Sequence, residues 1–133
     1  MNTKSLMTMS SIILGTVGIF ALFAPENLLT LLSAPIASPL PTLIQMLGAL
    51  YFSMSLINWT AKDSAIGGIY ARPVSLGNFS HFFSGMFILG NYLLTKEFNI
   101  FTLLIALVYA VLAFLFYWLV FRHTGIVANK TQL

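Results

Sequence analysis

The sequence predicts an all-α protein, a four-transmembrane-helix bundle that forms a single membrane domain over residues 1–133. Four apolar runs, at about residues 6–24, 40–60, 73–94 and 98–121, are each long enough to cross a hydrocarbon core of about 30 Å, which takes about 20 helical residues. Charged residues make up only 7% of the chain, compared with about 25% in soluble domains. The mean hydropathy of +0.94 likewise excludes an ordinary soluble domain.

The first predicted helix, 6–24, is too long for the apolar region of a typical signal peptide, which has about 7–15 residues. It carries small residues at steps of three and four, which place them on one face. Helices in lipid associate by close packing, so small residues indicate a helix–helix contact. We expect this contact inside the bundle, with a homodimer face as the alternative. The residues are Thr8, Ser11, Gly15 and Gly18.

A short amphipathic segment, Glu26–Leu32, is predicted between the first two long helices. Pro25 is tolerated in a first turn, and Glu26 complements the helix dipole there. The four leucines of this segment are too apolar for a loop that is exposed to water. We expect the segment to lie on the outer membrane surface or against the bundle. Prolines 35, 39 and 41 then interrupt the chain before the second long helix.

The second and third long helices each carry polar residues at helical spacing, which favours a polar side on each. On the third helix the opposite side is rich in phenylalanine and is predicted to face lipid. We predict a ligand pocket between these two helices. Its candidate lining residues are Gln45, Tyr51, Ser55, Asn58, Asn78, His81 and Tyr92. The fourth helix has few polar groups and is predicted to be the most exposed to lipid.

The connection 61–72 contains Gly67-Gly68, which allows a tight turn. Lys62, Asp63 and Arg72 flank it. These three charges are interpreted either as an exposed loop pair or as a contact for a lipid headgroup or a partner protein.

The basic residues divide unevenly between the two predicted sides of the membrane. Lys96 lies on one side, and because Lys and Arg are retained on the cytoplasmic face, the other side is predicted to be cytoplasmic. Both chain ends therefore face the cytoplasm, while Glu26 and Glu97 lie outside. The basic residues of the cytoplasmic side are Lys4, Lys62, Arg72, Arg122 and Lys130.

Parts of the second and third predicted helices and the connection between them resemble known proteins. These parts are Leu47–Tyr51, the hairpin Gly67-Gly68-Ile69-Tyr70-Ala71-Arg72-Pro73, Gly77-Asn78-Phe79 and His81. In these residues the chain resembles a group of small bacterial four-helix membrane proteins. More distantly, in size and helix count only, it is similar to the DoxX-like and Erg28-like proteins. The resemblance implies a multi-pass protein of a bacterial inner membrane, and it brings no catalytic residue with it.

His81 is the strongest candidate for chemistry, since polar groups inside a membrane are costly and often functional. It is predicted to lie about 13 Å deep, in a hydrogen-bonded His–Asn–Gln network or a ligand site. Haem ligation is disfavoured because His123 lies at a different depth. The chain has no cysteine and no membrane-embedded Asp or Glu, so no metal site is predicted. We expect no cofactor and no nucleic-acid partner.

The sequence therefore predicts a protein that is not an enzyme, because no acid–base pair or activated nucleophile lies within the helices. The leading interpretation is an accessory or scaffold subunit, or a binder of a small lipophilic ligand. Its expected partners are membrane lipids and either further copies of itself or another membrane protein. The alternative is a small oligomeric transporter or channel, which the missing embedded carboxylate disfavours.

Overall fold

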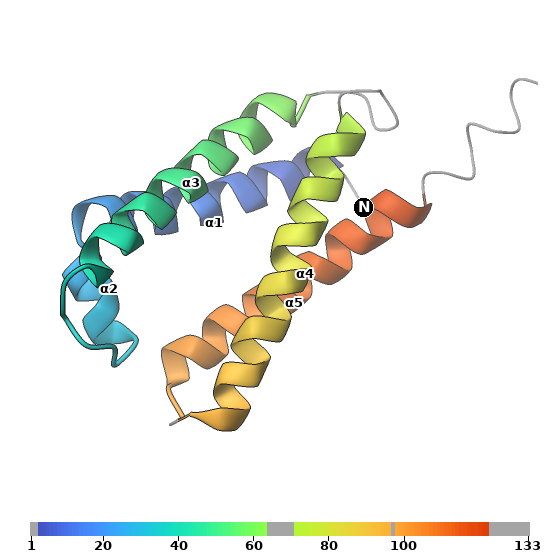
Figure 1. Cartoon of the computed structure of the whole chain (residues 1–133). Helices are drawn as coiled ribbons and strands as arrows, with labels where there is room; N and C mark the ends of the chain where they lie inside the picture. The colour runs from blue at the N-terminus through green and yellow to red at the C-terminus, as the bar shows by residue number, and fades with distance from the viewer. Residues whose placement is uncertain (1–2, 64–70, 97, 123–133) are drawn as a thin grey trace, which may run out of the picture. The chain divides into compact units, whose positions relative to one another are not determined.

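The computed structural model describes residues 3–63, 71–96 and 98–122, and this part of the chain consists of five α-helices without a strand (Figure 1). The predicted all-α class is confirmed, and the helix ends agree with the predicted runs to within three residues. The helices are α1 (Thr3–Phe23), α2 (Pro25–Leu31), α3 (Leu40–Ala61), α4 (Ala71–Thr95) and α5 (Ile100–Arg122).

Three of the described helices are long and apolar enough to cross a membrane: Thr3–Phe23, Leu40–Ala61 and Ile100–Phe121. Helix α4 is the longest, at 25 residues, but is not one of the three. Polar residues such as Asn78, His81 and Asn91 lower its hydropathy. The structure therefore confirms three of the four predicted membrane-spanning candidates.

Helices α1, α2 and α3 form one compact unit, and α4 and α5 form another. In the first unit α1 and α3 run antiparallel, with Ser10 of α1 next to Asn58 of α3 and Gly18 next to Gly48. Helix α2 packs against both, and its Leu29 side chain is buried. The predicted short segment is therefore a helix folded against its neighbours.

Glycines allow a close approach between α1 and α3. A Cβ atom added at Gly18 would lie 2.7 Å from the backbone nitrogen of Phe52 and 2.9 Å from the carbonyl oxygen of Gly48. A Cβ at Gly15 would lie 2.7 Å from Ser55 Oγ. Of the small residues predicted to mark a helix contact, Ser11, Gly15 and Gly18 therefore pack against α3. Thr8 is half-buried, and its hydroxyl donates to the Lys4 carbonyl of its own helix.

Helix α2 ends in a Schellman motif, in which two backbone bonds satisfy carbonyls that the helix leaves unpaired. The amide of Ala34 donates to the Leu29 carbonyl at 2.8 Å, and that of Ser33 donates to the Thr30 carbonyl at 3.0 Å. Ser33 has a φ of 56°, in the left-handed region that this motif requires. The turn directs the chain toward α3.

Helices α4 and α5 form an antiparallel hairpin whose core is aromatic. Phe82 and Phe116 are fully buried and stack with their ring centroids 5.8 Å apart. Asn99 begins α5 as an N-cap, since its Oδ1 accepts hydrogen bonds from the amides of Phe101 and Thr102. This hairpin positions His81, on α4, beside α5.

Candidate functional site

Ser11 and Ser55 form a reciprocal pair across the contact between α1 and α3. Ser11 Oγ donates to the Ser55 carbonyl at 2.8 Å, and Ser55 Oγ donates to the Ser11 carbonyl at 2.8 Å. Both side chains are buried. Each hydroxyl proton therefore joins one helix to the other, in the place where Gly15 leaves room for the Ser55 hydroxyl.

Two amide side chains of α3 also bond to α1. Asn58 is fully buried, and its Nδ2 donates to Ser10 Oγ at 3.1 Å. Gln45 Nε2 donates to the Leu22 carbonyl at 3.0 Å. Because the last carbonyls of a helix have no partner within it, Gln45 satisfies one at the end of α1. These predicted ligand residues thus use donors to hold α3 against α1.

His81 lies against α5 and forms a hydrogen bond with Tyr109, with 3.1 Å between Nε2 and the Tyr109 hydroxyl oxygen. The imidazole is half-buried, whereas Tyr109 is buried. Tyr109 lies directly over Gly85, where any added Cβ would collide with its ring. The glycine one turn after His81 is therefore what lets the tyrosine ring lie against α4.

The burial of the other α4 residues agrees in part with the predicted polar and phenylalanine-rich sides. Asn78 is buried, and its Nδ2 donates to the Val74 carbonyl at 2.8 Å. Phe83 and Phe87 are exposed, as predicted for the phenylalanine-rich side, whereas Phe79 is half-buried among aromatic rings. The predicted polar side divides: part of it faces α5, and the remainder is exposed.

The seven candidate ligand residues belong to both units. Gln45, Ser55 and Asn58 bond to α1, and His81 bonds to α5. Tyr51 of α3 is half-buried, and Tyr92 of α4 is exposed. The pocket between α3 and α4, and the His–Asn–Gln network, stay predictions.

The charged residues of the predicted headgroup site lie at helix ends. Lys62 places its ammonium nitrogen 3.1 Å from the centroid of the Trp59 ring, in a cation–π contact one turn apart at the end of α3. Asp63 and Arg72 are exposed. The Gly67-Gly68 turn between them lies outside the described residues.

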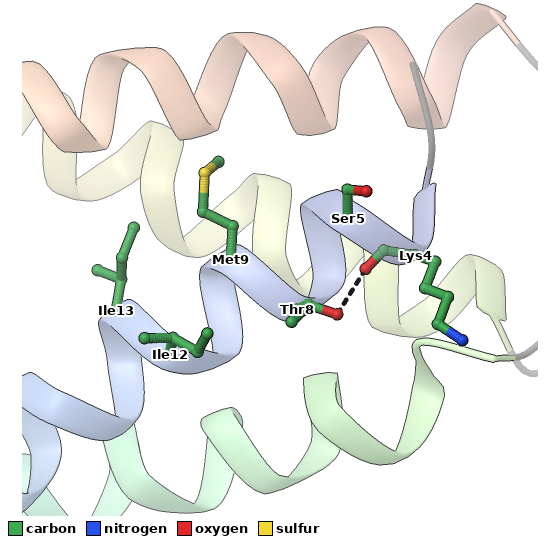
Figure 2. Close-up of a pocket in the computed structure, with 6 residues that line it drawn as sticks. All are labelled: Lys4, Ser5, Thr8, Met9, Ile12 and Ile13. Atoms are coloured by element: carbon green, nitrogen blue, oxygen red, sulfur yellow. Dashed lines mark hydrogen bonds between the residues drawn. The ribbon is translucent and has the colours of Figure 1, made fainter.

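A hollow of about 450 Å³ runs along the first half of α1. Figure 2 shows its lining, which changes from polar to apolar along the helix, and the bond from Thr8 Oγ1 to the Lys4 carbonyl at 2.8 Å. The polar end holds an ammonium group and two hydroxyls, and the other end holds thioether and aliphatic side chains. The lining residues are Lys4, Ser5, Thr8, Met9, Ile12 and Ile13.

Sequence reasoning missed Tyr109 and Ser10 as partners. Tyr109 is the one polar side chain in a long apolar stretch of the fourth predicted helix, and that isolation could have marked it as a hydrogen-bond partner. Ser10 adjoins the predicted small-residue face but was not part of it. Within residues 3–63, 71–96 and 98–122, no three histidine or acidic side chains gather where they could hold a metal ion.

The side chains that bond from one helix to another offer hydrogen-bond donors and acceptors, and no carboxylate is among the bonds given above. Such a set can fix helices together or bind a neutral polar group. No protein family, curated protein or solved structure matches this chain.

Proposed function

We propose that the protein is a multi-pass integral protein of a bacterial inner membrane, with four spans and both termini in the cytoplasm. Three apolar helices support this placement directly. Helix α4 supports it by length, since 25 residues extend about 37 Å, more than a hydrocarbon core of about 30 Å. Its Asn78 and Ser75 side chains are buried rather than exposed, which lowers the cost of inserting them.

Within the membrane we propose a non-catalytic role as an accessory or scaffold subunit. The observation that carries this proposal is that polar side chains of the helices form hydrogen bonds to the neighbouring helix. Ser55 and Asn58 bond to α1, and His81 bonds to Tyr109 of α5. Groups that could relay a proton or bind a substrate instead join the helices of each unit. Such bonds add about 0.6 kcal/mol each and fix which residues of two helices lie opposite.

Reconstitution into liposomes tests this role. Under an imposed pH gradient the wild-type protein should give no uptake or release beyond that of empty vesicles. His81→Ala should leave this result unchanged and should lower the thermal unfolding temperature in detergent. Transport that is driven by the gradient in the wild type and lost in His81→Ala would contradict a scaffold role and would favour the transporter alternative.

A second candidate function is binding of a lipophilic ligand, and the hollow along α1 favours it. Lys4, at one end of the hollow, suits an anionic headgroup, while Ile12 and Ile13 suit an acyl chain. Native mass spectrometry after mild detergent extraction should then show anionic phospholipid on the wild type and less on Lys4→Gln. Equal retention on both proteins would rule out this site.

A further inference from the structure

The side chains that line the hollow on α1 form two rows at steps of four residues (Figure 2). Rows at this spacing are the ridges of a helix surface, and a groove lies between two neighbouring rows. All the lining residues belong to α1, so the groove is a feature of this one helix. One row is Lys4, Thr8 and Ile12, and the other is Ser5, Met9 and Ile13.

The groove has the length and the polarity of a lipid in one leaflet of a membrane. From Lys4 to Ile13 the helix rises about 14 Å, close to half of a hydrocarbon core of about 30 Å. The ammonium and hydroxyl groups lie at the end that the proposed topology assigns to the cytoplasmic surface. The apolar side chains of Met9, Ile12 and Ile13 follow toward the middle of the membrane. A lipid of the cytoplasmic leaflet matches this order, with its headgroup at Lys4 and an acyl chain along the isoleucines.

The polar end of the groove presents donors beside one acceptor. A threonine hydroxyl has one proton to donate and two lone pairs that accept. Thr8 donates its proton to the Lys4 carbonyl at 2.8 Å, so while this bond is kept its oxygen can only accept from a ligand. Lys4 and Ser5 are exposed, and an ammonium and a serine hydroxyl can both donate. The ligand that fits has an anionic group for the donors and a hydroxyl for Thr8.

We propose that the groove holds an anionic phospholipid whose headgroup carries a hydroxyl beyond its phosphate, and that Thr8 selects for this hydroxyl. This inference deepens the lipid-binding function proposed above and rests on it. The phosphate oxygens accept hydrogen bonds from Lys4 and Ser5, and the headgroup hydroxyl donates to Thr8 Oγ1. A lipid without that hydroxyl leaves the Thr8 oxygen without a donor.

A lipid suits this groove better than the side chains of a neighbouring helix. A row of apolar side chains would fit between the two rows of α1, but it would place apolar groups against the Lys4 ammonium. An anionic headgroup complements that charge at a membrane surface. Lys4 and Ser5 also lie in the first turn of α1, where the helix dipole favours a negative charge.

Native mass spectrometry of the full-length protein in mild detergent tests this selection. The protein is given equal amounts of phosphatidylglycerol, whose headgroup carries hydroxyls, and of phosphatidate, which lacks them, with the same acyl chains. The wild type should retain about threefold more phosphatidylglycerol, the factor that one hydrogen bond of average strength between membrane helices supplies. Charge cannot produce this preference, because phosphatidate is at least as negative.

Thr8→Val removes the acceptor oxygen and nearly keeps the side-chain shape, so it should abolish the preference. Thr60→Val is the matched control and should keep it. Thr60 is an exposed threonine near the end of α3, and its hydroxyl likewise donates to a carbonyl four residues back, that of Leu56 at 3.0 Å. A wild type without the preference, or Thr8→Val protein that keeps it, would overturn the role of Thr8.

Two further variants separate a failure of this selection from a failure of lipid binding. Met9→Trp fills the groove, so it should lower the retention of both lipids and keep the preference. If Lys4→Gln lowers the retention of both lipids while the wild type shows no preference, the groove binds lipid but Thr8 does not select the headgroup. Unchanged retention in both Lys4→Gln and Met9→Trp would contradict the lipid site itself and would favour cover of the groove by protein.

Discussion

The Ser11–Ser55 and His81–Tyr109 pairs each join two neighbouring helices through polar side chains. In the first, each hydroxyl reaches the backbone carbonyl of the other helix. In the second, an imidazole meets a phenol over Gly85. Each pair lies where a glycine leaves room for one of the two bonded side chains, so the hydrogen bond depends on the glycine. A residue with a larger side chain in place of Gly15 or Gly85 would displace the bonded partner.

The His81–Tyr109 bond gives a prediction at the scale of a single atom. Tyr109→Phe removes the phenol oxygen and leaves the ring, so it should lower the free energy of unfolding by about 0.6–1.7 kcal/mol, from the average to the maximum found for hydrogen bonds between membrane helices. Thermal unfolding in detergent measures this loss. Tyr117→Phe is the matched control, because Tyr117 is an exposed tyrosine on the same helix. An equal shift in both variants would show that the bond to His81 is not what stabilises the hairpin.

At the scale of the helices, the approach of α1 to α3 depends on Gly18. Gly18→Ala adds a methyl group 2.7 Å from the backbone nitrogen of Phe52, which cannot rotate away, so the helices must move apart. We expect a loss of about 1–3 kcal/mol, as in overpacked cores. Gly90→Ala is the control, since nothing lies within 4 Å of its added Cβ and alanine is the better helix former.

Urea or thermal unfolding of the two alanine variants should therefore separate them, with Gly18→Ala less stable than wild type and Gly90→Ala as stable or more so. If Gly18→Ala matched the wild type, α1 and α3 would not approach as closely as the structure places them.

The helices themselves could be predicted from the sequence because long apolar runs bounded by proline and charge leave few alternatives. The run 6–24 became α1 (Thr3–Phe23), and the segment Glu26–Leu32 became α2 (Pro25–Leu31). The partners of the polar groups could not be predicted. A period of 3.6 residues shows which side chains share a face, but not which helix lies opposite. Asn58 was expected to line a pocket toward the third predicted helix, and nothing in its spacing indicated that its amide donates to Ser10 of α1.

The candidate site was predicted less well than the fold for a second reason. His81 was singled out as the candidate group of α4, but its hydrogen-bond partner, Tyr109, lies in the most apolar helix, where few polar neighbours mark a face. Gly85 shares the polar side of the third predicted helix, and the sequence does not indicate which residue it contacts. Its role in seating the Tyr109 ring follows from three-dimensional packing alone.

At the scale of the whole molecule, we expect four membrane crossings, with most basic residues on the cytoplasmic side. Lys62 and Arg72 flank the connection between α3 and α4, which the excess of basic residues assigns to the cytoplasm. The connection between α2 and α3, which contains Ser38, is assigned to the periplasm with Glu26. Four spans require that these two connections lie on opposite sides of the membrane.

The most direct test is cysteine accessibility in intact cells, with single cysteines introduced at Ser38 and at Ser64 in a chain that has none of its own. Ser38→Cys should react with a membrane-impermeant maleimide added from outside. Ser64→Cys should react only after the inner membrane is permeabilised. Labelling of both positions from the periplasm would contradict the four-span account and the membrane placement of α3 on which the rest depends.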